Sequence, residues 1–316
     1  MRKLPHAYEP YTWAISTAEA ARIAGIPPEN VLRFDGNVPP RPPPTARPET
    51  AAGALAEINV YTHGGYPLIH EAIAAYAGVA PDQVVLGAGA DDLILLCARA
   101  FAGPGDRVAV ADEPTYPMLR LGAWLAGAEV SHENPALTFC CRPHNPTGAL
   151  VDLPAARPLV VDEAYFEYAG ETAAGLLDDG VIVIRTFSKA FGLASARIGY
   201  LLADRRTAAA LAERQAPAPV STPSVALALA GLADPPDVRP TLEERDRLAA
   251  GLRALGLEPL PSWANFLYVP LPEAVRVAGD LAARGLLVRG YVDAIRITVR
   301  DAADDDRLLE ALAELL

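Results

Sequence analysis

Lysine is almost absent from this sequence of 316 residues, although basic residues are not. Lysine and arginine together number 27, and only Lys3 and Lys189 are lysines, which leaves 25 arginines. Arginine stays protonated in proteins, whereas a desolvated lysine can lose its proton and form a Schiff base with a carbonyl group. Lys189 follows the apolar run VIVIRTF at 181–187. We therefore expect Lys189 to be a reactive amine just past a buried strand.

Cysteine and histidine are also scarce. The three cysteines, Cys97, Cys140 and Cys141, give an odd count without the spacing of a disulfide framework. Free thiols in a reducing cytoplasm fit this pattern best. The five histidines show no close ligand spacing, so we expect no metal site.

Excess positive charge and long apolar runs are missing as well. The formal net charge is −12, which argues against a nucleic-acid-binding protein because such proteins need a basic face. The N-terminal residues contain no unbroken apolar core of the kind found in signal peptides. The longest uncharged stretch, 215–233, carries three prolines near its start, so we expect a buried helix with a connector and no membrane span. These absences favour partners that are small molecules.

Short β-branched runs alternate with helical patterns through the middle of the chain. The strand-like runs are VVLGAG (84–89), RVAVADE (107–113), ALTFCC (136–141), PLVVDEAY (158–165), VIVIRTF (181–187) and IGYLLA (198–203). Apolar strands separated by helices indicate an α/β sheet that is largely parallel and covered on both faces. Functional sites on such sheets lie at the carboxyl ends of the strands.

The two ends of the chain have a different character. Residues 1–48 are rich in proline, with VPPRPPPTARP at 38–48, and predict an extended arm that packs on the small domain or on a partner subunit. Residues 49–234 would form the large domain. After about residue 235, a mixture of helices and short strands predicts a small α+β domain over 235–316.

The segment GAGADD at 87–92 combines a strand end, a glycine turn and a helix start. It matches only part of a dinucleotide fingerprint, since Asp92 occupies the position of the third glycine, which disfavours an NAD dehydrogenase. The free amides at such a helix start could still hold a phosphate. Asp91 and Asp92 could instead be ordinary carboxylates of a first helical turn.

Two further segments are ambiguous when each is taken alone. PHNPTG at 143–148 reads most simply as a turn. Asp162, at the end of the apolar run PLVV, could be a helix cap or a functional charge. We also expect the Asn145–Pro146 peptide bond to be cis, because tight turns beside active sites favour that form.

The segment SKAFGLASARIGY at 188–200 resembles the lysine motif of fold-type I pyridoxal-phosphate (PLP) aminotransferases of class I/II. GAGADDLI, PTY at 114–116, PHNPTG and DEAYFEY match the same family in the right order. The branch that the chain resembles most is the histidinol-phosphate aminotransferases, to which LRFDGNVPP and AIRITV are also similar. The resemblance covers roughly residues 31–300 and implies a large domain with a mostly parallel seven-stranded sheet covered by helices, plus a small α+β domain.

The resemblance also implies that PLP is the cofactor. Lys189 would form an aldimine with PLP and, once substrate displaces it, would move a proton between the substrate Cα and the cofactor. Asp162 would pair with the pyridine nitrogen and keep it protonated. The remaining implied contacts are Tyr165 and Asn145 to the 3′-oxygen, Tyr116 against the ring face, and Ala90, Asp91, Ser188 and Arg197 to the phosphate.

Substrate and subunit contacts follow from the same resemblance. Arg296 would clamp the substrate carboxylate in a bidentate manner. Asn37 and Arg289 are candidates for reading the rest of the substrate. Tyr61 matches a tyrosine that reaches the phosphate from the neighbouring subunit, which implies a homodimer with two shared sites.

The sequence departs from the family pattern in several places. Only thirteen residues separate Gly148 from Asp162, where the family has a longer insertion with a helix, and the stretch 129–143 is also short. We expect a thinned outer layer and an intact cofactor site. Leu119 stands where the histidinol-phosphate enzymes often have a tyrosine, and Ile69-His70 replaces a common Leu-Arg pair.

The activity that we expect is transfer of an amino group between an amino acid or amino alcohol phosphate, with histidinol phosphate first, and a 2-oxo acid such as 2-oxoglutarate. A PLP-dependent threonine-phosphate decarboxylase is the alternative enzyme. A non-catalytic PLP-binding regulator is the third hypothesis, although residues 1–48 are too short and too rich in proline for a helix-turn-helix.

Overall fold

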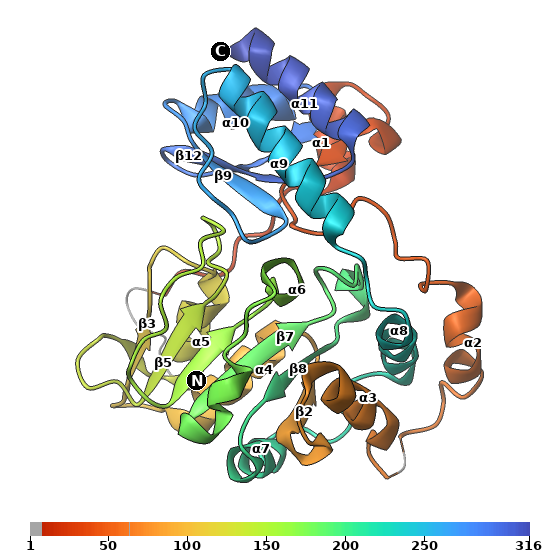
Figure 1. The fold of residues 1–316 in the computed structure, drawn as a ribbon, viewed down its shortest axis with the longest axis vertical. Helices are drawn as coiled ribbons and strands as arrows, with labels where there is room; N and C mark the ends of the chain where they lie inside the picture. The colour runs from red at the N-terminus through yellow and green to blue at the C-terminus, as the bar shows by residue number, and fades with distance from the viewer. Residues whose placement is uncertain (1–7, 63) are drawn as a thin grey trace.

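A seven-stranded sheet forms the centre of the larger part of the molecule (Figure 1). The computed structural model describes residues 8–62 and 64–316. In spatial order the strands are β2 (Val84–Gly87), β8 (Gly199–Leu202), β7 (Val181–Thr186), β6 (Leu159–Asp162), β5 (Leu137–Cys141), β3 (Arg107–Val110) and β4 (Glu129–Val130). In the described residues, β8 runs antiparallel to both β2 and β7, and the other neighbouring strands of the sheet pair in parallel. The expected mostly parallel seven-stranded sheet is confirmed.

Helices cover both faces of this sheet because its central strands are apolar on both sides. Val160 and Ile184 point into a core that contains residues of α4 (Ala90–Phe101), α5 (Pro117–Ala126) and α7 (Arg205–Ala212). Val161 and Val183 point into the opposite core. That core is closed by α3 (Pro67–Ala77), α8 (Thr222–Ala233) and the 3-10 helix η3 (Ala174–Asp179). The carboxyl ends of β5, β6 and β7 therefore share one edge of the sheet.

A smaller α+β part lies above this edge in Figure 1. It contains an antiparallel sheet in the order β11 (Arg289–Gly290), β12 (Ala294–Thr298), β9 (Phe266–Pro270). A parallel pair joins β1 (Leu32–Arg33) to β10 (Leu286–Leu287). The helices of this part are α1 (Thr17–Ala24), α9 (Arg239–Ala254), α10 (Ala274–Ala282) and α11 (Ala302–Leu315).

The expectation of an extended arm over residues 1–48 is wrong for residues 17–24, which form α1. Ser16 caps this helix by accepting a hydrogen bond from the Glu19 amide at 3.1 Å, and Gly25 ends it in the left-handed conformation. Good helix formers between a serine cap and a glycine stop explain the helix. The proline-rich character begins only at Val38. The segment before it also forms η1 (Pro28–Asn30), and α2 (Pro48–Ala56) follows it.

The connection between β5 and β6 contains no helix in the described structure, although parallel neighbours are usually joined through one. Residues 142–158 run back along the sheet instead. Val151 and Leu153 pack against the core that contains Cys140 and Val161. Both of those core residues are fully buried. An extended segment thus replaces the missing helix, as expected for a thinned outer layer.

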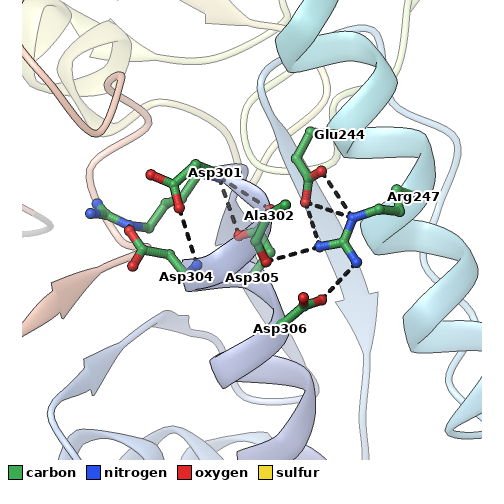
Figure 2. A network of polar contacts seen from close by, with 8 residues as sticks. Glu244, Arg247, Asp301, Ala302, Asp304, Asp305 and Asp306 are labelled. Carbon is green, nitrogen blue, oxygen red and sulfur yellow. Dashed lines mark hydrogen bonds and ion pairs between the residues drawn. The ribbon is translucent and has the colours of Figure 1, made fainter.

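A polar network fastens α11 to α9 in the smaller part (Figure 2). The Arg247 guanidinium contacts Glu244 at 2.8 Å and Asp306 at 2.6 Å, and donates to the Ala302 carbonyl at 3.1 Å. Asp305 is fully buried and accepts the Arg300 amide at 3.2 Å. Burial raises the pKa of Asp305 to about 8, and its contact with Glu244 acts in the same direction. Among the described residues, no helix has the length and apolarity needed to cross a membrane.

Candidate active site

A cavity of about 590 Å³ opens at the carboxyl edge of the large sheet, below β11 and β12. Every site residue expected from the sequence lines it, except Tyr61. These residues are Asn37, Ala90, Asp91, Tyr116, Asn145, Asp162, Tyr165, Ser188, Lys189, Arg197, Arg289 and Arg296. Segments that lie far apart in the chain therefore converge on one cavity.

Lys189 lies just beyond β7, whose last residue is Thr186. Its Nζ donates a hydrogen bond to the Gly36 carbonyl at 3.2 Å and lies 5.8 Å from the centre of the Tyr165 ring. Burial, followed by the nearby Arg296 guanidinium, lowers the pKa of Lys189 to about 8. The amine therefore gives up its proton more readily than an ordinary lysine does, as a nucleophile requires.

Asp162 is the last residue of β6 and is only 2% exposed. Its Oδ1 accepts a hydrogen bond from the Ala164 amide at 3.1 Å. Burial raises the pKa of Asp162 to about 7, and Lys189 acts in the opposite direction. A buried carboxylate at a cavity wall is stabilised by a cationic partner. A protonated ring nitrogen in the cavity would be such a partner.

The start of α4 forms the other end of the cavity. Gly89 has a φ of 86°, and a Cβ there would lie 2.7 Å from Nη2 of Arg197. That guanidinium lies 3.3 Å from Oδ2 of Asp91, and the Tyr116 hydroxyl donates to Oδ1 of Asp91 at 2.7 Å. Glycine is favoured at this position because its φ is positive, whereas the Arg197 side chain could move aside for a Cβ. The helix start and the cation together suit a phosphate.

Ser188 completes this end of the cavity. The Thr186 hydroxyl donates to the Ser188 hydroxyl at 2.9 Å, so the serine proton remains available for an anion. Gly199 faces the same turn, since a Cβ there would lie 3.2 Å from the Ala90 amide nitrogen. The close approach of β8 to the start of α4 thus depends on glycine.

Arg296 joins the two parts of the molecule across the cavity. Its Nη1 donates to the Asn145 Oδ1 at 2.5 Å and its Nη2 donates to the Asp35 carbonyl at 2.8 Å, while its Nε is buried without a hydrogen bond. Arg289 is the cross-strand partner of Arg296. Because directly opposed residues project from the same face of a sheet, β11 and β12 present two guanidinium groups to one side of the cavity.

Tyr61 is the one expected residue that the structure keeps away from this cavity. It is 85% exposed and lines a second cavity of about 600 Å³ with Thr62, Gly65, Tyr66, Pro217 and Ala218. Within one chain it contributes nothing to the first cavity.

Several residues of the site were missed from the sequence. Tyr11 and Trp13 of the N-terminal arm line the cavity, but they belong to no local motif. His144 is buried between the Thr147 hydroxyl, 2.8 Å from Nδ1, and the Asp112 carbonyl, 2.9 Å from Nε2. It thereby links the turn that carries Asn145 to the loop before Tyr116, and its place within PHNPTG was the available signal.

The expectation of a cis Asn145–Pro146 peptide is wrong. In the described residues the cis peptide bonds are Glu113–Pro114, Arg142–Pro143 and Arg157–Pro158. The turn is closed by the Gly148 amide, which donates to the His144 carbonyl at 2.6 Å, and Gly148 supplies the positive φ of 78°.

The cavity suits an aldehyde cofactor with an anionic tail. The amine of Lys189 could react with a carbonyl carbon, Asp162 could pair with a protonated ring nitrogen, and Arg197 with the start of α4 could hold a phosphate. Pyridoxal phosphate carries all three groups. The fold and the site therefore define a PLP-dependent enzyme of fold type I.

The chain belongs to the aminotransferase class I and II family, whose sequence model matches residues 29–134 and 131–312. It is 33% identical to the histidinol-phosphate aminotransferase of Roseiflexus castenholzii over 98% of this chain and 96% of that protein. The structure of histidinol-phosphate aminotransferase from Sinorhizobium meliloti with pyridoxal-5′-phosphate matches with a TM-score of 0.83, at 26% identity over 98% of this chain and 97% of that one. L-threonine-O-3-phosphate decarboxylase from Porphyromonas gingivalis shares the fold, with a TM-score of 0.79 at 19% identity over 90% and 99% of the two chains. The protein is a PLP-dependent aminotransferase.

Proposed function

We propose that this aminotransferase moves an amino group between histidinol phosphate and a 2-oxo acid such as 2-oxoglutarate. The observation that carries the proposal is the pair Arg289 and Arg296, which places two cations over the cavity that holds Lys189. Paired guanidinium groups suit a phosphate monoester in one half-reaction and the carboxylates of a 2-oxo acid in the other. The names of the relatives support the same substrate.

The chain's own residues would divide the chemistry between them. PLP, when bound, supplies an aldehyde carbon for the substrate amine and a ring that accepts electrons. Asp162 would hold a proton at the pyridine nitrogen. Lys189 Nζ would take a proton from the substrate Cα and return it on the cofactor side, because a pKa of about 8 suits both steps. Arg197, Ser188 and the amides of Ala90 and Asp91 would hold the phosphate.

Asn145 and Tyr165 would hydrogen-bond the ring oxygen in this proposal, and Tyr116 would stack on the ring face. Arg296 donates a hydrogen bond to Asn145, so a substrate anion would compete with Asn145 for the guanidinium. At the outer wall, Tyr11 and Trp13 line the cavity. Their rings would contact the imidazole of histidinol phosphate and exclude water from it.

The assembly is part of the same proposal. We propose a cytoplasmic homodimer in which the partner's copy of Tyr61 completes each phosphate site, since this exposed tyrosine has no role within its own chain's cavity. We also propose the division into an arm over 1–48, a large domain over 49–234 and a small domain over 235–316. The pairing of β1 with β10 favours docking of the arm on the small domain.

The alternative of a threonine-phosphate decarboxylase is favoured by one feature of the site. O-phosphothreonine carries a carboxylate and a phosphate together, and two arginines could hold both at once. The two reactions differ in which bond at Cα is broken.

A donor screen with the purified PLP-loaded protein tests the proposal. Histidinol phosphate with 2-oxoglutarate should yield glutamate, measured by a coupled assay, and O-phosphothreonine should release no carbon dioxide. Arg289→Ala should raise the KM for histidinol phosphate about tenfold or more, because a charge-assisted hydrogen bond is lost. Release of carbon dioxide from O-phosphothreonine, without formation of glutamate from histidinol phosphate and 2-oxoglutarate, would refute the proposed reaction.

A further inference from the structure

A buried chain of three polar side chains leads from β12 to the cavity. Thr298, the last residue of β12, is 0% exposed. Its hydroxyl donates to the Asn37 Oδ1 at 3.0 Å and accepts a hydrogen bond from the Asn37 backbone amide at 2.9 Å. The side-chain amide of Asn37 in turn donates to the Tyr165 hydroxyl at 2.9 Å. Asn37 and Tyr165 are also almost completely buried.

The hydrogen bonds in this chain have a defined direction. The Thr298 hydroxyl has a single proton, which goes to the Asn37 Oδ1. The Asn37 Oδ1 is therefore held as the acceptor, so the NH₂ group of the same amide must face Tyr165. Because the Tyr165 oxygen accepts that bond, its own proton remains available for another acceptor.

The surroundings of Tyr165 indicate that the acceptor for its hydroxyl proton lies in the cavity. In the described part of the chain, the Tyr165 hydroxyl donates no hydrogen bond to protein, and its side chain lines the cavity. The charged groups that act on it are Arg296, Asp162 and Lys189. Two of them are cations and cannot accept a proton from the hydroxyl. The third, Asp162, accepts from the Ala164 amide and from Cys141 Sγ among the described residues, and not from Tyr165. An anionic oxygen bound in the cavity could.

We propose that Thr298 is a positioning residue that acts through Asn37 to keep the Tyr165 hydroxyl a hydrogen-bond donor toward the cofactor's ring oxygen. The inference rests on the proposed placement of that oxygen beside Tyr165. A donated hydrogen bond stabilises the ring oxygen as an anion. With PLP bound to Lys189, the relay would therefore lower the pKa at which the cofactor takes up its proton.

The test is a pH titration of the visible absorption of the PLP-loaded enzyme. Thr298→Val removes the proton that fixes the Asn37 amide and should raise the apparent pKa by about one unit. Thr298→Ser keeps the hydroxyl and should titrate like the wild-type enzyme. Asn37→Asp puts a carboxylate beside Tyr165, which would accept the tyrosine proton, and should raise the apparent pKa further.

A double-variant comparison separates the relay from a general loss of packing. If Thr298 acts through Tyr165, adding Thr298→Val to Tyr165→Phe should cause no further shift. Thr138→Val is the matched control, because Thr138 is a buried threonine on β5 that does not line the cavity; it should leave the titration unchanged. A shift that persists in the Tyr165→Phe background would overturn the proposal.

Two further results would overturn the proposed role of Thr298. An unchanged titration in a folded Thr298→Val enzyme would overturn the relay, and a titration of Asn37→Asp equal to wild type would do the same if Thr298→Val fails to fold. The result is independent of the substrate, since the titration needs only bound PLP. An enzyme that aminates no 2-oxo acid from histidinol phosphate would refute the proposed function and leave this measurement intact.

Discussion

Asp162 and Asp305 are two buried carboxyl groups with raised pKa values in two different parts of the molecule. They are 2% and 0% exposed, and burial raises their pKa values to about 7 and about 8 respectively. Asp305 belongs to the closed network between α9 and α11 (Figure 2), where the Arg300 amide approaches both of its oxygens. Asp162 lines an open cavity. Burial therefore raises the pKa of a carboxyl group both in a closed network and at the wall of an open cavity.

The difference shows that a raised pKa does not by itself identify a functional residue. Asp305 has its partners within the protein, which is typical of a structural network. Asp162 accepts a hydrogen bond from the Ala164 amide and faces a cavity that also contains Lys189 and Arg296. Access to a ligand, together with nearby cations, distinguishes Asp162 from Asp305 and supports the functional role proposed for it.

Replacing the amine should have the largest effect at the open site. Lys189→Ala should lower kcat/KM by about 10⁴-fold or more, because among the described residues of the cavity Lys189 supplies the nucleophilic amine. The visible absorption of lysine-bound PLP should disappear while the far-UV circular dichroism is unchanged. Lys3→Ala, which removes the chain's other lysine, is the control and should retain full activity. Substantial turnover by Lys189→Ala would contradict the assignment.

Replacing Asp162, the carboxylate of the open site, should have the second largest effect. Asp162→Asn should lower kcat about 10²–10³-fold, because the ring nitrogen loses its charged partner, while PLP binding is retained. In the cofactor-free protein, the same change should raise Tm at pH 8. Burial raises the pKa of Asp162 in the native state to about 7, above the ordinary value of 3.8, so its ionisation opposes folding in that pH range. Unchanged kcat would show that Asp162 is structural like Asp305.

Replacing Asp305, the carboxyl group of the closed network, should change the stability of the protein and leave kcat unchanged. Its native pKa of about 8 lies above the unfolded value of 3.8. The native state therefore binds this proton more tightly than the unfolded state does. The stabilisation is fully present in acid and is lost as pH rises from about 4 to about 8. Asp305→Asn should flatten this dependence and raise Tm at pH 8 by about 2 °C, with kcat unchanged.

Thermal unfolding of Asp305→Asn at pH 5 and pH 8 measures this difference. Asp306→Ala is the control, since Asp306 is exposed in the same network and pairs with Arg247. Loss of an exposed pair should change the free energy of unfolding by less than about 1 kcal/mol. A reduced kcat in Asp305→Asn would mean that the network influences the site after all.

The cofactor half of the site could be predicted from the sequence, because its residues lie in short motifs directly after strands. Asp162 ends β6 and Lys189 follows β7, so the parallel sheet brings them to the same edge. Arg296 was also predicted from a local motif. Its pairing with Arg289, however, depends on the register of the β11–β12 hairpin.

The parts that could not be predicted depend on contacts between distant segments. Thr298 and Asn37 are 261 residues apart in the chain, and no local pattern links them. The position of Tyr11 and Trp13 over the cavity depends on how the N-terminal arm crosses the molecule. In the arm, the abundance of proline after residue 37 obscured the serine cap and glycine stop of α1.

The helix-free connection between β5 and β6 has a consequence for engineering the enzyme. Val151 and Leu153 hold this segment on the sheet, whereas Ala155 and Ala156 beyond them are exposed. An exposed loop of small residues tolerates added sequence well. Because Ala155 and Ala156 lie just before the first residue of β6, a reporter domain or an affinity tag inserted between them would project from the amino edge of the sheet, opposite the carboxyl edge that carries the cavity.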